Sequence, residues 1–556
     1  MLRCSRLLGL VLACLIPACG DGRSSAERAA DEGVLVIGNN QEPQNLDPHK
    51  ATAVADGKII SALLEGLVRP DARDDTVVHP GMAERWEHNA DADEWTFHLR
   101  EAQWSDGRPV RAQDFAYAYR RLLHPAFGGK YAEMLYPLRG AEAYNKGQAP
   151  WEAVGVRTPD DRTLVLTLSG PMPQLPYLLM HFTWFPVPEH AVEAHGGMLD
   201  RRSAWTRPEN WVGNGAYVPE ERVFNDYLSV RPNPNYWRAG EVKNRGIRFL
   251  PVVNGYTETR MYFGGKLHIT NNVPPEMLEM AASREPGSFC RDDYYCTIFY
   301  RLNTTRGPLA DQRVRRALSL AVDREMLVQR VVRGAGKSAF TFTPPGAGYA
   351  LDDGGESARS QGERETEARR LLAEAGYPDG RGFPTLELMT SSRDVQRLMA
   401  ETIQAMWMKA LGIHVEIRSC EWSAYKAAQQ NMDYDISSSS WSGDYLDPAT
   451  FVELWCSGNN CTGWGRAAYD AEVDAARASA EPEQRLEHLR RAERMMLREQ
   501  PVIPLYWSER TYMKSPRVRG WYPLMLDNHP LDAVELLPSG AAADAAPHSR
   551  EGGSER

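Results

Sequence analysis

The chain has 556 residues, of which 42% are hydrophobic and 25% are charged. That length is sufficient for two or three domains, each built around a substantial hydrophobic core. A formal net charge of −10, without any long stretch of lysine and arginine, excludes a general nucleic-acid binder, so no nucleic-acid partner is expected.

The N-terminus has the pattern of a secretory signal. Arg3 and Arg6 precede the apolar run 7–16, which is too short to span a membrane because a spanning helix needs about 20 apolar residues. The residues Ile16-Pro17-Ala18-Cys19 are typical of a bacterial lipoprotein signal, which predicts cleavage after residue 18 and a lipid on Cys19. We therefore expect an anchored protein on the periplasmic side of the cell envelope.

Two features of this signal leave alternatives open. Pro17 is unusual at its position, and Cys14 is a competing site for lipidation. An ordinary signal peptide with an incidental cysteine is the simpler interpretation. In either case we expect residues 1–18 to be the signal peptide and 19–32 to be a flexible tether.

Strand and helix patterns alternate along the rest of the chain, as in an α/β fold. Apolar and alternating runs predict strands at 34–37, 95–99, 163–168, 246–250, 386–389, 414–418 and 502–507. Helical periodicity predicts helices at 314–332, 365–375, 395–411 and 471–497. The tail 538–556 is rich in Ala, Gly and Ser, so we expect it to be disordered.

The sequence contains no convincing catalytic constellation. The stretch Gly334 to Ser338 resembles part of a phosphate-binding loop, but Val331 stands where the first glycine belongs and a predicted helix precedes it. His190, Glu193 and His195 do not share one helix face, and neither an HExxH nor a GxSxG pattern is present. We therefore expect a binding protein rather than an enzyme, with no catalytic residues, no metal and no cofactor.

Cys456 and Cys461 flank a turn-like Ser-Gly-Asn-Asn segment, which predicts a short disulfide in an oxidising compartment. A zinc site is the alternative, but neither CxxC pairs nor nearby histidines support it. The mature chain has an odd number of cysteines besides Cys19, so at least one thiol stays unpaired unless it bonds another chain.

The segment from Trp441 to Pro448 places an acid, Asp444, among aromatic side chains and after the alternating stretch 434–437. From spacing alone, a solvated aspartate in a glycine-containing turn is the simpler interpretation. If the carboxylate is sheltered from water, it must pair with a cation or take up a proton. In a secreted binding protein, that cation would be an ammonium group of the ligand.

Short motifs that match one protein family extend from about residue 34 to residue 537. They are Leu46-Asp47-Pro48-His49-Lys50, Glu65-Gly66-Leu67, Ala83-Glu84-Arg85-Trp86, Trp95-Thr96-Phe97-His98-Leu99-Arg100, Trp104-Ser105-Asp106-Gly107, Gln113-Asp114-Phe115, Asn214-Gly215-Ala216-Tyr217, Asp311-Gln312-Arg313-Val314-Arg315 and Leu371-Leu372-Ala373-Glu374-Ala375-Gly376-Tyr377. In order and spacing, the chain resembles the bacterial extracellular solute-binding proteins of family 5, the peptide and nickel receptors of ABC importers. Within the family it is most similar to the periplasmic oligopeptide-binding proteins.

The resemblance implies an α/β, periplasmic-binding-protein-like fold of class II, a two-lobed clamshell with an extra inserted domain. The implied lobes are lobe I (33–64, 189–295 and 512–537), lobe II (the insertion 65–188) and lobe III (296–511). Two connections between lobes I and III would act as a hinge, and ligand would be trapped when the lobes close. The implied partners of this monomer are an oligopeptide, the permease subunits that recognise the closed form, and the membrane.

The resemblance also implies a ligand site. The family acid that pairs with the peptide α-ammonium matches Asp444, and the segments that pair with the peptide backbone match Val54 and Ser440, Trp441 and Ser442. Pocket positions of the family match Tyr131, Asn272, Tyr294, Phe299, Trp422 and Trp441. From the sequence alone, each of these aromatic residues would be assigned to the core.

Several positions depart from the family pattern. Ser438 stands where the best-known oligopeptide receptor has a basic residue for ligand carboxylates, and three further departures are Thr52, Gln396 and Gln429. Each lost charge-assisted hydrogen bond is worth about 1.5–3 kcal/mol, so we expect altered recognition at the carboxyl end or in ligand length. The family disulfide at Cys296 is absent here, because Ser442 stands at the position of its partner. Cys296 would then pair with Cys290 or Cys420, or remain a free thiol.

Four functions compete at this point. The favoured one is an oligopeptide receptor of an ABC importer. A murein-peptide receptor and a receptor for dipeptides, nickel chelates or other small solutes belong to the same family. A hydrolase or a chaperone-like periplasmic protein is the alternative from another class, and cleavage of bound peptides would distinguish the hydrolase.

Overall fold

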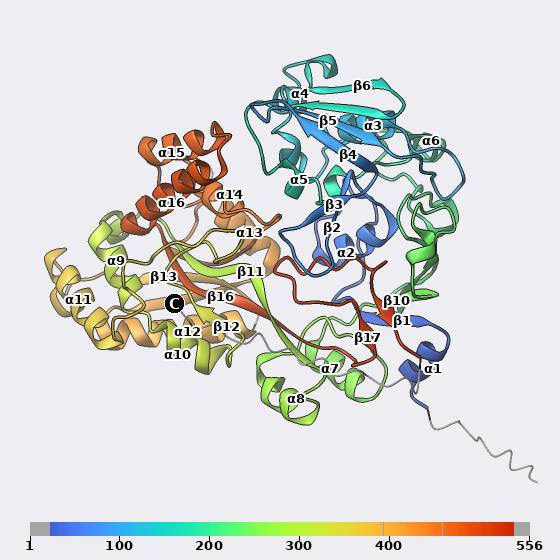
Figure 1. Cartoon of the computed structure of the whole chain (residues 1–556). Coiled ribbons are helices and arrows are strands. Elements are labelled where there is room, and N and C mark those ends of the chain that lie inside the picture. The colour runs from blue at the N-terminus through green and yellow to red at the C-terminus, as the bar shows by residue number, and fades with distance from the viewer. Residues whose placement is uncertain (1–22, 393, 459, 539–556) are drawn as a thin grey trace, which may run out of the picture.

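The structure is a computed structural model that describes residues 23–392, 394–458 and 460–538. The predicted signal peptide, Cys19 and all of the predicted disordered tail except Pro538 lie outside these ranges. Figure 1 shows two bodies side by side, one made mainly of the chain before residue 290 and the other of residues from about 300 to 500. No helix in the described ranges has the length and apolar character needed to cross a membrane.

The first sheet has four strands in the order β1-β10-β9-β8. They are β1 (Val34–Gly38), β10 (Gly246–Leu250), β9 (Tyr227–Pro232) and β8 (Tyr217–Val223). Because β1 and β10 pair in parallel, the chain needs a long crossover between them, and the whole second sheet is inserted there. The same region contains α1 (Ser25–Asp31), α2 (Val54–Leu63), α6 (Glu189–Ala194), α7 (Gly255–Phe263), α8 (Leu278–Arg284) and the pair β17 (Val518–Arg519) and β18 (Glu535–Leu536).

The second sheet is antiparallel, with the order β4-β5-β7-β6. Its strands are β4 (Ala83–His88), β5 (Glu94–Leu99), β7 (Thr163–Thr167) and β6 (Val156–Asp160). Burial alternates along β5, with Trp95, Phe97 and Leu99 inside, as the two-residue period of a strand requires. The hairpin β2 (Val68–Pro70) and β3 (Val78–Pro80) and the helices α3 (Ala112–Leu123), α4 (Ala141–Asn145) and α5 (Leu175–Leu178) complete this part.

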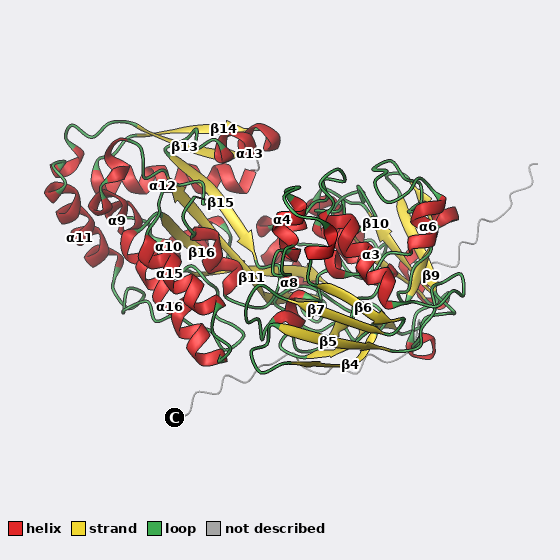
Figure 2. Cartoon of the chain, turned by 90° about the horizontal axis from the view of Figure 1, so that it is seen from above, coloured by secondary structure: helices red, strands yellow, loops and turns green. Residues whose placement is uncertain are grey.

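The third sheet has six strands in the order β12-β16-β11-β15-β13-β14. They are β12 (Gly336–Ser338), β16 (Val502–Met513), β11 (Phe289–Leu302), β15 (Ile436–Ser442), β13 (Leu386–Ser391) and β14 (Val415–Cys420). The helices of this body are α9 (Gln312–Leu320), α10 (Arg324–Met326), α11 (Gln361–Glu374), α12 (Asp394–Leu411), α13 (Trp422–Gln430), α14 (Ala449–Val452), α15 (Ala467–Arg477) and α16 (Pro482–Glu499). Figure 2 shows β15 directed toward the junction between the two bodies, where the antiparallel strand β11 begins.

The long strands β11 and β16 are the connections between the bodies. They pair from Phe289↔Met513 to Arg301↔Val502, with a register shift between Asp293 and Thr297. The first two sheets share one hydrophobic core, whereas most of the third sheet packs in a separate one. We keep the names lobe I, lobe II and lobe III for the predicted ranges, which stay a prediction, and β11 and β16 extend across the predicted boundaries of lobe III.

One predicted family motif has a purely structural role. Asp47 accepts two hydrogen bonds from the guanidinium of Arg121 on α3, at 2.9 and 2.6 Å, and both side chains are completely buried. The indole N–H of Trp205 also donates to Asp47, at 3.3 Å, and His49 contacts the same guanidinium. The motif therefore ties lobe I to lobe II through a paired and hydrogen-bonded buried charge.

All seven predicted strands are present, but two predicted helices are wrong in extent. The predicted helix 314–332 ends at Leu320 and restarts in α10, because Asp323 caps the new start by accepting from the Met326 N–H at 2.9 Å. The predicted helix 471–497 is divided into α15 and α16, and Pro482 stands at the first position of the second helix.

The predicted flexible tether 19–32 is also wrong over part of its length. Helix α1 occupies Ser25–Asp31, and its start has a capping box in which Ser24 and Glu27 exchange hydrogen bonds. Ala26, Ala29 and Ala30 are buried on one side of this helix. The small apolar side chains at helical spacing explain why the segment packs on lobe I.

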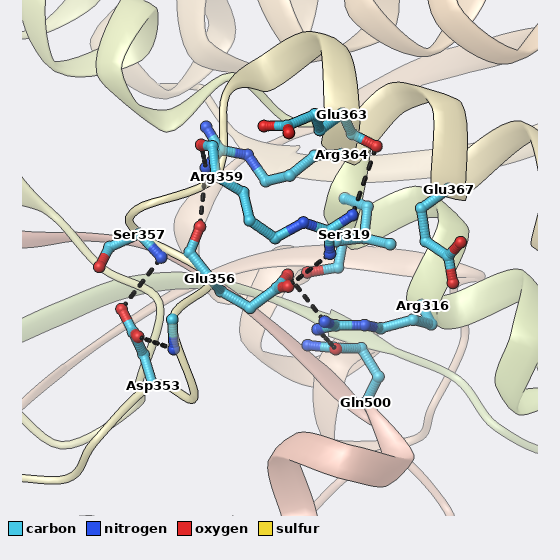
Figure 3. A network of polar contacts seen from close by, with 12 residues as sticks. Arg316, Ser319, Asp353, Glu356, Ser357, Arg359, Glu363, Arg364, Glu367 and Gln500 are labelled. Atoms are coloured by element: carbon cyan, nitrogen blue, oxygen red, sulfur yellow. Dashed lines mark hydrogen bonds and ion pairs between the residues drawn. The ribbon is translucent and has the colours of Figure 1, made fainter.

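A polar network holds the loop before α11 against lobe III (Figure 3). Glu356 accepts from Arg316 at 2.7 Å and from Arg359 at 2.6 Å, and Arg316 also donates to Gln500 at 3.2 Å. The buried guanidinium of Arg364 donates to the main-chain carbonyls of Glu356 and Arg359. The carbonyl oxygens accept hydrogen bonds from the buried guanidinium of Arg364, so the network has a structural role.

The five cysteines in the described ranges are free thiols. The predicted disulfide between Cys456 and Cys461 is therefore absent from the structure. Asn460 holds this turn instead, because its side-chain amide donates to the carbonyls of Trp455, Cys456 and Trp464. Cys296 is buried and free as well.

Candidate functional site

A cavity of about 170 Å³ lies where the three lobes meet. Lobe I contributes one face of α2 and the segment 521–531, lobe II contributes 177–182, and lobe III contributes 442–444 at the end of β15. Tyr294 of β11 completes the wall. The cavity therefore contains parts of the chain that only the folded arrangement of all three lobes brings together.

Asp444 lines this cavity in the loop that follows β15. Its N–H donates to the hydroxyl of Thr450 at 3.4 Å, and the next turn is fixed by the buried ion pair of Asp447 and Arg485, at 2.7 Å. Gly443 is needed before the acid, because a Cβ there would lie 2.4 Å from the Tyr295 ring. The loop that carries Asp444 is thus held rigidly.

The carboxylate of Asp444 is sheltered from water. Burial, and to a smaller extent the negative charge of Glu133, raises the pKa of Asp444 to about 6. Within the described ranges, this carboxylate accepts no hydrogen bond and forms no ion pair. A half-buried acid without a partner bears part of the cost of desolvation, so a ligand cation is a favourable partner for it.

One edge of β15 is open next to Asp444. On one side β15 pairs with β11 along its full length, whereas on the other side β13 pairs only with Ile436 and Ser437. The carbonyl of Ser438 accepts from the Tyr425 hydroxyl and therefore points away from β11, while the Gly443 N–H donates to the Tyr295 carbonyl of β11. The main-chain N–H and C=O groups of successive strand residues face opposite edges of the strand. Those of Ser440 and Ser442 therefore face the open edge, as the carbonyl of Ser438 does.

Four other predicted ligand residues lie at or near the cavity. Val54 and Tyr294 line it, and Val54 is exposed at the first position of α2. Tyr131 packs edge-on against the cavity-lining His181, with ring centroids 5.6 Å apart. Burial and then the Asp444 charge raise the pKa of Tyr131 to about 12, which places its hydroxyl in the same electrostatic environment. Trp441 is half-buried on β15, beside the open edge.

The structure places Phe299, a predicted pocket residue, away from this cavity. Phe299 is completely buried and packs edge-on against Phe342 and Trp455, with centroids 4.9 and 5.8 Å apart, because its side chain points into the aromatic core of lobe III. Two more predicted residues do not line the cavity. Trp422 stacks on Tyr425 at the start of α13, and the main-chain N–H of Asn272 donates to Glu258 at 3.2 Å.

The sequence reasoning missed the charged residues on the lobe I side of the cavity. Lys58 lies one turn after Val54 on the same face of α2, a spacing that could have indicated it. Asp527 and His529 come from the C-terminal segment, and no sequence pattern connects that segment with α2. In the described ranges, no group of three or more His, Cys, Asp and Glu side chains is arranged to hold a metal ion.

Residues 77–463 match the family described as bacterial extracellular solute-binding proteins, family 5 middle. The chain belongs to this family. It is 33% identical over 512 residues to the periplasmic oligopeptide-binding protein OppA of Salmonella typhimurium, covering 91% of this chain and 92% of that protein.

Solved structures of relatives have the same fold. The murein tripeptide binding protein MppA of Escherichia coli matches with a TM-score of 0.79 at 32% identity, over 90% of this chain and 98% of the other. Haemophilus influenzae OppA in complex with RPPGFSPFR matches with a TM-score of 0.77 at 29% identity, over 91% and 99%. The predicted fold class, an α/β periplasmic-binding-protein architecture with three lobes, is confirmed. The family consists of solute-binding proteins and is not a family of enzymes.

Proposed function

We propose that this protein is the substrate-binding component of an ABC importer, and that it captures oligopeptides in the cavity between its lobes. The observation that carries the proposal is a sheltered carboxylate without a partner, Asp444, beside the open edge of β15. Relatives of similar length are named as oligopeptide-binding and murein tripeptide binding proteins, and one was solved with a peptide.

Asp444 and the open edge of β15 would bind the groups that all linear peptides have, an α-ammonium group and a peptide backbone. The α-ammonium of the peptide pairs with Asp444, and its backbone pairs as an added strand with the main chains of Ser440 and Ser442. Neither contact reads a side chain, so sequence selectivity stays low. Closure about β11 and β16 buries the peptide, and the ligand favours the closed form because only that form supplies contacts from all three lobes.

Calorimetry with a free-amine tripeptide and its N-acetylated form tests this function. We expect the free peptide to bind most tightly between about pH 7 and pH 8 and to lose up to about tenfold per unit below about pH 6, because protonated Asp444 cannot pair with an ammonium group. Its affinity should also fall above about pH 8, where the amino group of the peptide loses its proton. The acetylated peptide should bind at least about 30-fold more weakly at pH 7.5 and lose this pH dependence. Equal affinity for both peptides at pH 7.5 would contradict the role of Asp444.

We propose an extracytoplasmic location with a lipid anchor on Cys19. The relatives named above include a periplasmic protein, and the sequence has a lipoprotein-type signal. Replacing Cys19 with alanine should move the protein from the membrane fraction to the soluble fraction of the envelope. Cys4→Ala is the matched control and should leave the protein on the membrane; retention of the Cys19→Ala variant in the membrane would refute the anchor.

A murein-peptide receptor is the second candidate, because MppA matches the chain as well as OppA does. Mass spectrometry of ligands that copurify with the protein separates the two. Linear peptides of ordinary L-residues support an oligopeptide receptor, and peptides that contain D-residues and diaminopimelate support a murein-peptide receptor.

A further inference from the structure

The lobe I wall of the cavity carries a positive charge that the protein itself does not pair. Lys58 projects from α2 into the cavity that also contains Asp444. Within the described ranges, its ammonium group makes no hydrogen bond and no ion pair. Burial lowers the pKa of Lys58, and the nearest charges that act on it are those of Asp527, Arg510 and Glu258.

Both neighbouring carboxylates have other partners, although Oε1 of Glu258 is buried without a hydrogen bond. Asp527 pairs with Arg510 at 2.9 Å and with His529 at 3.0 Å. Glu258 accepts the main-chain N–H of Asn272 at 3.2 Å. These groups attract Lys58 through space, but they leave its three N–H donors without direct acceptors, and such a sheltered ammonium group gains from an anionic partner.

The two unpaired charges line the same cavity, and neither of them contributes to the pKa shift of the other. The charge that acts on Asp444 is that of Glu133 in lobe II, whereas Lys58 responds to groups of lobe I and β16. We propose that Lys58 binds a carboxylate of the ligand while Asp444 holds the ligand ammonium. This inference rests on the proposed function and specifies its substrate class: short zwitterionic peptides, or peptides with an acidic residue close to the amino end.

The shared cavity indicates where that carboxylate can be. Because Asp444 and Lys58 line the same cavity, a carboxylate that reaches Lys58 while the ammonium group is at Asp444 belongs to one of the first residues of the peptide. Ser438 at the other predicted carboxylate position is buried and uncharged, so Lys58 provides a charge that this position lacks.

Calorimetry on the full mature protein tests the inference with four ligands. Dialanine and its C-terminal amide differ in a terminal carboxylate, and the tripeptide amides Ala-Glu-Ala and Ala-Gln-Ala differ in a side-chain carboxylate. We expect the wild type to prefer the carboxylate in at least one pair by about 30-fold or more, and that pair identifies the source. In Lys58→Met and Lys58→Gln the preference should fall to within about threefold, whereas Lys58→Arg should retain most of it.

Lys409→Met is the matched control, because Lys409 is an exposed lysine in the last turn of α12, outside the cavity, and its variant should bind like the wild type. A carboxylate preference that is equal in the wild type and in both neutral variants overturns the inference, and so does a wild type without any preference. In those cases free-amine peptides still bind and the proposed function stands. If the wild type binds no peptide, the proposed function fails and the inference falls with it.

Discussion

The Asp444→Asn variant should bind free-amine peptides at least about 2 kcal/mol more weakly than the wild type and should also be more stable when no ligand is bound. The weaker binding follows because the variant lacks the unpaired negative charge that would pair with the ligand ammonium. The higher stability follows from burial, which raises the pKa of Asp444 from 3.8 to about 6.

The sign of the stability effect comes from proton binding. Between about pH 4 and pH 6 the folded protein holds a proton on Asp444 that the unfolded chain releases, so stability falls as the pH rises through this window. Above it, the ionised carboxylate costs up to about 3 kcal/mol, since one pKa unit corresponds to about 1.4 kcal/mol. Asparagine resembles the protonated acid in shape and avoids this cost.

Binding calorimetry measures the change in affinity for free-amine peptides. Thermal unfolding of the ligand-free protein at pH 7.5 and at pH 4.5 measures the change in stability. The melting temperature of the variant should exceed that of the wild type at pH 7.5, and the difference should shrink at pH 4.5. Asp379→Asn is the matched control, because Asp379 is exposed in its ion pair and its variant should change neither quantity. A variant that loses stability and keeps its affinity for free-amine peptides would show that Asp444 is a structural residue.

Much of the fold could be predicted because local patterns and burial agree. The strand β5 alternates in sequence and in burial, and β1 and β10 are apolar because parallel strands are covered on both faces. The predicted helix 471–497 failed for a local reason. Pro482 was the signal against a continuous helix, because proline lacks the N–H that a helix interior needs but fits the first turn of a new helix.

The site was predictable only in part. The sequence left open whether Asp444 is solvated, because its burial depends on lobe II residues far away in the chain, such as Tyr131 and His181. Phe299 was assigned to the pocket by resemblance alone, whereas alternation along β11 directs its ring into the aromatic core of lobe III. Lys58 was missed because the groups that define its environment, Asp527 and Arg510, come from the end of the chain.

Removal of the carboxylate of Asp47 should have the largest effect on stability. We expect Asp47→Ala to lower the free energy of unfolding by about 3–5 kcal/mol, because it leaves the guanidinium of Arg121 buried without its counter-ion. Although burial alone would raise the pKa of Asp47, Arg121 holds this pKa well below its usual range. The stabilisation is therefore present at neutral pH and is lost only in acid, below about pH 4.

Denaturant unfolding of three variants separates the cost of an orphaned charge from the value of the pair. Arg121→Met should destabilise the protein to a similar extent, whereas the double variant should cost less than the sum of the two single changes, because neither charge is then left alone. Glu101→Ala removes one partner of an exposed pair, with a side chain 89% exposed, and should change the free energy of unfolding by less than about 0.5 kcal/mol. Strictly additive effects at Asp47 and Arg121 would mean that each residue stabilises the junction of lobes I and II through packing rather than through the ion pair.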